Sequence, residues 1–294
     1  MRESAVEAGG LRFGLLETGE PGRPLVLCFH GFPDSAFTWR HLLPALAEQG
    51  YHAVAPYLRG YAPTDLPAAR FGLADLATDV LALEETLRGE GASVLVGHDW
   101  GAAAVYGALL REPGRWPCAV GVAVPPAAGW SIDAVSPRQL RRSWYSFLFQ
   151  LPDASVPEGL AAADDLALVD GLWADWSPGY DAAHDIDRAK EALQPPGRLT
   201  AAIRYYREAP TRLRTPAEAE AEREAFRELD VALLYLHGAR DGCIGLDSAE
   251  LVEPSFPPRT EKVVFDDAGH FLHLEQPDEF NRLVLDFLAR NAPA

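Results

Sequence analysis

The chain has 294 residues, of which 48% are apolar and 23% are charged, and its formal net charge is −17. This balance excludes a disordered chain and favours one large domain, or one domain with an insertion. The acidity argues against a nucleic-acid-binding protein, because such a protein must neutralise phosphates. The three cysteines include no C-x-x-C pair, which argues against a disulfide framework and against a zinc site.

Targeting signals are not evident. Residues 1–14 lack the continuous apolar segment of a signal peptide, and no apolar run reaches the ~18 residues needed to cross a bilayer. We therefore expect a cytoplasmic protein, a monomer or homodimer, with neither a membrane nor a nucleic acid as its partner.

Strand and helix patterns alternate in the first part of the chain. Continuous apolar runs predict buried strands at 25–29, 52–56, 93–96 and 119–124. Apolar residues at helical spacing predict helices at 73–87 and 101–111. This alternation, with its short connections, predicts a parallel sheet that is covered by helices on both faces.

The alternation stops near Pro126. Residues 127–214 show only helical spacing and hold four of the seven tryptophans, which predicts a helical insertion. A helix beginning at Pro216 then leads back to strand patterns at 231–236 and 262–265 and to a closing helix at 279–291. We therefore expect an α/β core formed by residues 1–126 and 215–294, interrupted by the insertion at 127–214.

The sequence Gly97-His98-Asp99-Trp100-Gly101 joins a predicted strand to a predicted helix. Small residues two positions before and after the central one allow a sharp turn that exposes the central side chain, as in a nucleophile elbow. Here that side chain is the carboxylate of Asp99, which can attack an sp³ carbon and form an alkyl ester. The alternative is that Asp99 only caps the helix that follows.

A base and an orienting acid follow in the order expected for such an elbow. Asp241 comes after the strand at 231–236, and His270 comes after the strand at 262–265. Open α/β sheets place their sites at these carboxyl ends of strands. Asp266 and Asp267 are alternatives to Asp241, but they adjoin the histidine in sequence and would have to fold back.

An oxyanion hole is also predicted. His30-Gly31-Phe32-Pro33 follows the strand at 25–29. Pro33 has no backbone N–H and cannot donate a hydrogen bond, so the donor expected from this loop is the N–H of Phe32. The second donor is the N–H of Trp100, the residue after the proposed nucleophile.

These motifs resemble the α/β-hydrolase fold, and within it the epoxide hydrolases and the related haloalkane dehalogenases. The resemblance rests on HGFPDSAFTW at 30–39, GHDWG at 97–101, and the loops at Asp241 and His270. It implies a mostly parallel sheet with an inserted helical cap, an aspartate nucleophile, and no metal or organic cofactor. It also implies a hydrolase that opens a small apolar epoxide to a vicinal diol.

The resemblance further implies that two cap tyrosines bind the epoxide oxygen, and it places them at Tyr145 and at Tyr206 rather than Tyr205. A phenol stays protonated at neutral pH and can donate a hydrogen bond to a forming alkoxide. The alternative is that these rings only pack the cap. Phe32, Trp100, Trp144 and the two tyrosines are the expected substrate contacts.

Two other functions stay open. A haloalkane dehalogenase would use the same Asp, His and acid, with Trp100 as one halide donor; its second donor is often an asparagine at the position of Phe32. A small-molecule receptor or a biosynthetic cyclase on the same fold is the other alternative, because fold does not fix function.

Overall fold

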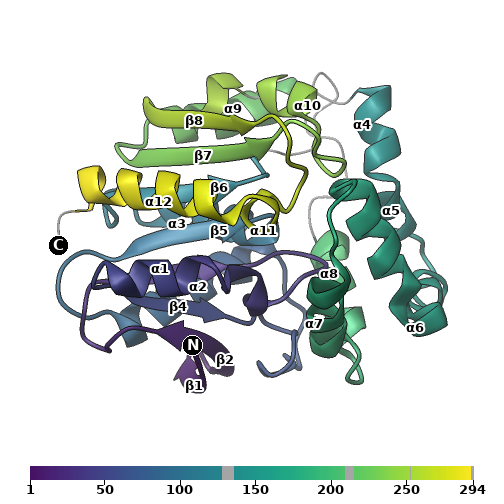
Figure 1. Cartoon of the computed structure of the whole chain (residues 1–294). Coiled ribbons are helices and arrows are strands. Elements are labelled where there is room, and N and C mark those ends of the chain that lie inside the picture. The colour runs from purple at the N-terminus through teal and green to yellow at the C-terminus, as the bar shows by residue number, and fades with distance from the viewer. Residues whose placement is uncertain (128–135, 209–214, 252, 293–294) are drawn as a thin grey trace.

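The computed structural model describes residues 1–127, 136–208, 215–251 and 253–292. Its centre is an eight-stranded sheet with the order β1-β2-β4-β3-β5-β6-β7-β8 (Figure 1). Only the β1–β2 and β2–β4 pairs are antiparallel. The strands are β1 (Arg2–Ala8), β2 (Leu11–Thr18), β3 (Leu25–Phe29), β4 (His52–Pro56), β5 (Val94–His98), β6 (Cys118–Val122), β7 (Ala232–Gly238) and β8 (Arg259–Phe265).

The central strands are buried on both faces, as their continuous apolar runs predict. Leu27 and Phe29 of β3 pack in one apolar cluster with α2 (Leu73–Leu87) and α3 (Trp100–Arg111). Val26 and Cys28 belong to a second cluster with α1 (Leu42–Glu48) and α12 (Pro277–Asn291). Figure 1 shows α1 and α12 on the near face of the sheet. The α/β sheet covered on both faces is therefore confirmed.

The sheet differs from the sequence prediction in where one strand ends and in containing two further strands. The strand expected at 119–124 ends at Val122, because Ala123 has a φ of 66° and turns the chain out of the extended conformation. The antiparallel strands β1 and β2 were not predicted, since β1 lies at the sheet edge and most of its side chains are exposed or half-buried. Such a strand lacks the apolar run that identifies the central ones.

Helices alone occupy the described part of the insertion, residues 136–208. They are α4 (Pro137–Arg142), α5 (Trp144–Leu148), α6 (Ser155–Trp176), α7 (Ala183–Leu193) and α8 (Arg198–Glu208). We call this group the cap; it lies beyond the carboxyl ends of the parallel strands (Figure 1). The backbone of α6 leaves the helical conformation at residues 163–166. The predicted cap begins at residue 127, next to residues outside the described ranges, and ends at residue 214, which itself lies outside them. Both boundaries therefore stay predictions.

The cap is fastened to the sheet by buried contacts. The indole N–H of Trp173 donates to the carbonyl of Pro33 at 2.8 Å, and its ring stacks on Phe271 with centroids 3.5 Å apart. Arg40 forms an ion pair with Asp185 of α7. These contacts hold α6 and α7 against the loops at the carboxyl ends of the strands, so the cap covers that edge of the sheet.

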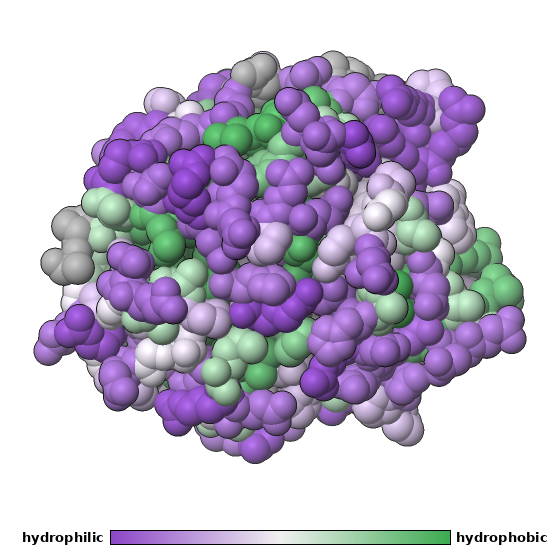
Figure 2. All heavy atoms as spheres, viewed as in Figure 1, coloured by the Kyte–Doolittle hydropathy of each residue, from purple (hydrophilic) through white to green (hydrophobic). Residues whose placement is uncertain are grey.

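The remaining elements complete the core after the cap. They are α9 (Pro216–Arg227), α10 (Leu246–Leu251), α11 (Leu272–Glu275) and two short 3₁₀ turns at Ala36–Trp39 and Glu253–Ser255. Among the residues described, none of the helices combines the length and the apolarity that crossing a membrane requires. Apolar surface gathers at the right-hand edge of the molecule, over the cap (Figure 2). Its exposed members on and near α4 to α6 are Leu140, Trp144, Phe147, Leu151, Val156 and Leu160.

Candidate active site

Asp99 occupies a strained turn between β5 and α3. Its φ of 52° and ψ of −119° lie in a region that side-chain-bearing residues rarely adopt. The flanking glycines are required by close approach: a Cβ on Gly101 would lie 2.1 Å from the carbonyl oxygen of Phe29, and one on Gly97 would lie 2.4 Å from that of Gly101. The turn therefore has the geometry of a nucleophile elbow. The Asp99 side chain makes no capping hydrogen bond to α3.

The two oxygens of the Asp99 carboxylate have different surroundings. Oδ1 accepts a hydrogen bond from the N–H of Phe32 at 2.8 Å, and the N–H of Trp100 lies close enough to lower the pKa of the carboxylate. Oδ2 lies 3.8 Å from Nε2 of His270. A Cβ on Gly31 would lie 2.3 Å from the Asp99 side chain, so glycine is needed for the loop after β3 to approach it. Both predicted oxyanion donors thus meet at Asp99.

Asp241 and His270 lie on the loops after β7 and β8, as their positions in the sequence predict. Nδ1 of His270 donates to Oδ2 of Asp241 at 2.9 Å, and both side chains are fully buried. In the neutral imidazole, this bond leaves the lone pair on Nε2, which lies 3.8 Å from Oδ2 of Asp99. The alternative acids lie elsewhere: Asp267 pairs with Arg240 at the surface, and Asp266 is exposed.

Burial and charge shift the pKa values of this group in a consistent way. Burial raises the pKa of Asp99, although His270 and the two backbone N–H groups partly offset it. Burial by itself would lower the pKa of His270, but the adjacent Asp241 carboxylate outweighs it, and the net pKa is raised. The histidine is therefore able to accept a proton next to a carboxylate that is held by hydrogen bonds.

Backbone contacts with the cap and the elbow fix the two loops. The carbonyl oxygen of Trp176, the last residue of α6, accepts from the N–H of Gly242 at 3.1 Å and from that of His270 at 3.0 Å. His98 donates through Nε2 to the carbonyl of His270 at 3.0 Å. Sequence reasoning assigned neither Trp176 nor His98 a role. His98 adjoins Asp99 in the elbow motif, which was a signal, whereas nothing local identifies Trp176.

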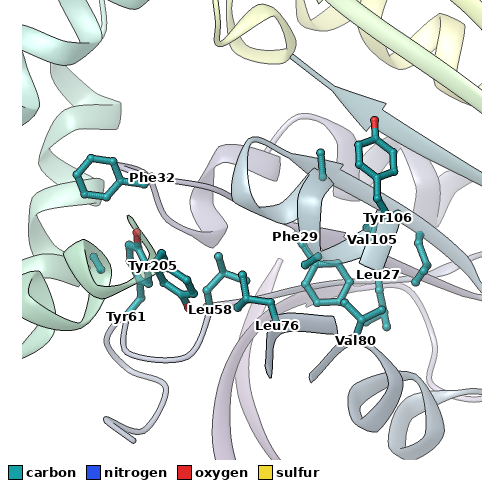
Figure 3. Close-up of a cluster of buried hydrophobic side chains, with 14 of the residues drawn as sticks. Leu27, Phe29, Phe32, Leu58, Tyr61, Leu76, Val80, Val105, Tyr106 and Tyr205 are labelled. Carbon is teal, nitrogen blue, oxygen red and sulfur yellow. The ribbon is translucent and has the colours of Figure 1, made fainter. Parts of the chain in front are cut away.

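Cap aromatics close the space above Asp99. The ring of Tyr206 lies 5.3 Å from Phe32, 5.0 Å from Trp100 and 5.5 Å from Tyr145, between centroids. Figure 3 shows Phe32 pointing toward the cap, away from Phe29 in the core below the sheet. The structure thus brings these four predicted residues together with the Asp99 carboxylate beneath them.

The hydroxyl groups of these tyrosines differ. Tyr206 Oη is buried; the indole N–H of Trp100 lies near it, but the two atoms do not reach hydrogen-bond geometry, and no other described residue bonds the hydroxyl. Tyr145 Oη lies 3.3 Å from Sγ of Cys243, a residue for which the sequence suggested no role. Burial raises the pKa of both phenols well above 10, so they stay protonated. Tyr205 is different, because its hydroxyl donates to the backbone carbonyl of Arg59 at 2.8 Å.

Trp144 is the predicted contact that the structure does not bring into this group. Its side chain is 43% exposed and lines a surface hollow with Arg141 and Arg142, whereas Tyr145 is buried. Neighbouring helical residues point about 100° apart, so both cannot face inward. Phe149 takes the inward place instead, with its ring 5.2 Å from that of Tyr206. Phe149 follows Tyr145 by four residues, and residues at this spacing lie on the same face of a helix, so the sequence contained a pattern that indicates this position.

Comparison with known proteins agrees with this geometry. Residues 24–277 match the family described as the alpha/beta hydrolase fold. The chain is 31% identical to epoxide hydrolase A of Mycobacterium tuberculosis, over 97% of each chain. It is 28% identical to human epoxide hydrolase 4, over 96% of this chain and 77% of that protein.

Solved structures show the same likeness. The crystal structure of epoxide hydrolase A from Mycobacterium thermoresistibile superposes with a TM-score of 0.79 at 28% identity, covering 98% of both chains. The relatives thus cover the core and the cap together. This chain therefore belongs to the alpha/beta hydrolase fold family, in its epoxide hydrolase subgroup, and is a hydrolase.

Proposed function

We propose that the protein hydrolyses an apolar epoxide to a vicinal diol through a covalent ester on Asp99. The observation that carries this proposal is the unequal surroundings of the two Asp99 oxygens. Oδ1 is held by the N–H of Phe32 at 2.8 Å, whereas Oδ2 lies 3.8 Å from Nε2 of His270. An oxygen that is not held in this way is the one placed to act as the nucleophile.

The first half-reaction forms the ester. Oδ2 of Asp99 attacks one epoxide carbon, the carbon–oxygen bond of the ring breaks, and the electron pair goes to the ring oxygen. The phenols of Tyr145 and Tyr206 donate hydrogen bonds to that oxygen and stabilise the developing alkoxide. The unpartnered hydroxyl of Tyr206 supports this role, because it requires a partner that substrate can supply.

The second half-reaction releases the diol. His270, oriented by Asp241, removes a proton from a water molecule through Nε2. That water attacks the carbonyl carbon of the Asp99 ester, and the negative charge that develops on Oδ1 is stabilised by the N–H groups of Phe32 and Trp100. Collapse of this intermediate breaks the ester bond, and the departing oxygen takes the proton held by His270. The remaining proton of the attacking water passes to the ring oxygen held by the tyrosines, so the carboxylate and the neutral histidine are restored and a neutral diol leaves. None of these steps calls for a metal or an organic cofactor.

The substrate class follows from the lining. The side chains that pack around Tyr206 and His270 include those of Phe32, Phe149 and Trp176, which are buried, aromatic and uncharged. Such a lining favours an apolar substrate. A haloalkane is the second substrate to test, because the same Asp and His would also serve that reaction.

The test is to trap the ester in a variant that cannot hydrolyse it. We expect His270→Gln, mixed with an apolar epoxide, to gain the mass of one whole epoxide on the peptide that contains Asp99. The matched control, Asp99→Asn combined with His270→Gln, should gain nothing. A bromoalkane offered separately distinguishes the alternative, since a dehalogenase would gain the alkyl group and release bromide. Adducts on other peptides only would contradict the proposed nucleophile.

A further inference from the structure

We propose that the active site is also an inhibitory site for one thiophilic divalent cation, such as Zn²⁺ or Cd²⁺, held by Asp99, Cys243 and His270. One ligand atom of each of these buried side chains lies within 4.8 Å of the others. Carboxylate oxygen, thiolate sulfur and imidazole nitrogen are the ligands that zinc prefers. The cation is an inhibitor here and not a cofactor.

Asp241 positions two of the three ligands at once. Its Oδ2 accepts from Nδ1 of His270 at 2.9 Å, and its Oδ1 accepts from the backbone N–H of Cys243 at 2.7 Å. The first bond is the carboxylate–histidine pairing that fixes metal-binding imidazoles, with the lone pair of Nε2 directed at the cation. Nε2 is buried and has no hydrogen-bond partner among the described residues. The second bond fixes the backbone of Cys243, so the residue that carries the thiol stays next to Asp241.

The separations and charges also suit such a cation. Nε2 of His270 and Oδ2 of Asp99 are 3.8 Å apart. Two ligands of a tetrahedral zinc ion with bonds of about 2.0–2.2 Å lie about 3.3–3.5 Å apart, so a shift of a few tenths of an ångström brings both atoms onto one cation. On binding, the cation displaces the Cys243 proton, which leaves to solvent, and a metal–sulfur bond forms. One thiolate and one carboxylate then balance the two positive charges, which a buried site requires. The nucleophile and the base are both occupied, so hydrolysis stops.

Sulfur distinguishes this site from the other buried group of ligand-type side chains. Asp34, His98 and His273 also lie within 4.8 Å of one another, but they offer no thiolate. A cation acting there would inhibit without Cys243. Mg²⁺ and Ca²⁺ should not inhibit, because they prefer oxygen ligands.

The experiment measures binding and inhibition separately. Without substrate, we expect Cd²⁺ to bind with a stoichiometry of one and to produce the ultraviolet charge-transfer band of a cadmium–thiolate bond. The band should disappear in Cys243→Ala and in Cys243→Ser, and Cd²⁺ should bind more weakly to His270→Gln. Because this readout needs no turnover, it stands even if the proposed epoxide reaction is wrong.

Inhibition is then measured for each variant by comparing its rate of hydrolysis with Cd²⁺ to its own rate without metal. The inhibition constant for Cd²⁺ should rise at least about tenfold in both Cys243 variants, which remove one of three ligands. Cys118→Ala is the matched control, since Cys118 is buried in β6 outside the site and its loss should leave the constant unchanged. Thermal unfolding checks that each variant is folded. Equal inhibition of the wild type and both Cys243 variants, or no cadmium–thiolate band, would overturn the proposal.

Discussion

Tyr205 and Tyr206 are adjacent on α8, yet their hydroxyl groups have different surroundings. The hydroxyl of Tyr205 is used in a buried hydrogen bond to Arg59, whereas that of Tyr206 faces the space above Asp99 without a partner. A hydrogen-bond donor to a developing alkoxide contributes more to the rate than one that only packs the cap. The two positions therefore form a matched pair for testing the role of the phenol.

We expect Tyr206→Phe to lower kcat/KM for an epoxide by about 10²-fold, in the range observed when one oxyanion donor is removed. Tyr205→Phe should change kcat/KM little, but it should lower the free energy of unfolding by about 1 kcal/mol through loss of a buried hydrogen bond. Steady-state kinetics and urea unfolding measure the two effects. The reverse result, with activity lost at Tyr205, would move the oxygen-binding role to that residue.

Asp34 provides a test at the residue scale that does not depend on substrate. It follows the loop that carries Phe32, is buried, and accepts a hydrogen bond through Oδ1 from the N–H of Ser35. Burial raises the pKa of Asp34 to about 7. The other groups facing it are the side chain of Thr38, the charges of Asp185 and Arg40, and the imidazoles of His98 and His273.

A raised pKa means that the folded chain binds this proton more tightly than the unfolded chain, whose aspartates titrate near 3.9. The free energy of unfolding should therefore fall as pH rises from about 4 to about 7, by about 3 kcal/mol from this group alone. Asp34→Asn removes the titration. The free energy of unfolding of the variant, measured relative to that of the wild type, should therefore rise by about that amount between pH 5 and pH 8. Urea unfolding at several pH values measures the gap.

The control is Asp187→Asn, which removes an exposed charge on α7. If the gap between Asp34→Asn and the wild type stays constant across this pH range, Asp34 does not titrate in it.

The turn between β5 and α3 leaves no room for a side chain at Gly101. A methyl group on Gly101 would meet the carbonyl oxygen of Phe29 at 2.1 Å, so β3 and α3 would have to separate. We expect Gly101→Ala to lower the free energy of unfolding by about 2 kcal/mol, as overpacking does, and to reduce kcat by displacing Asp99. Chemical unfolding and turnover are measured on the same sample.

Gly171 in α6 is the matched control for this substitution. A Cβ there would meet nothing within 4 Å, and the residue lies after the break at 163–166. Gly171→Ala should therefore raise the free energy of unfolding by about 0.5–1 kcal/mol through helix propensity alone. If the two substitutions change the free energy of unfolding in opposite directions, the effect of backbone crowding is separated from that of helix propensity. Equal effects would mean that the elbow can relax around a methyl group.

At the scale of the whole molecule, the sequence was informative wherever structure depends on neighbouring residues. The buried strands, the amphipathic helix at 73–87 and the elbow at 97–101 follow from short-range patterns, and the structure contains all three. The positions of Tyr145 and Tyr206 needed a family resemblance. Cys243, Phe149 and the carbonyl of Trp176 were not identified as parts of the site, because their places depend on how the cap packs against loops distant in sequence.

The net charge of −17 gives a last prediction for the molecule as a whole. Like charges repel more strongly in the compact state than in the expanded chain, so the excess acidity lowers stability. Salt screens this repulsion: the Debye length shrinks from about 30 Å at 0.01 M to about 8 Å at 0.15 M. We therefore expect Tm at pH 8 to rise over this range of NaCl concentration, even though exposed pairs such as Arg282 with Glu279 are weakened.

The control is the same salt series near pH 4.8, the isoelectric point, where the net charge and the repulsion vanish. There the exposed ion pairs are the main electrostatic contribution that salt can screen, so Tm should stay level or fall. Scanning calorimetry at both pH values separates the two effects because they have opposite signs. A fall of Tm with salt at pH 8 would mean that local pairing between the 26 basic and 43 acidic residues outweighs the net repulsion, and that the excess acidity does not limit the stability of the fold.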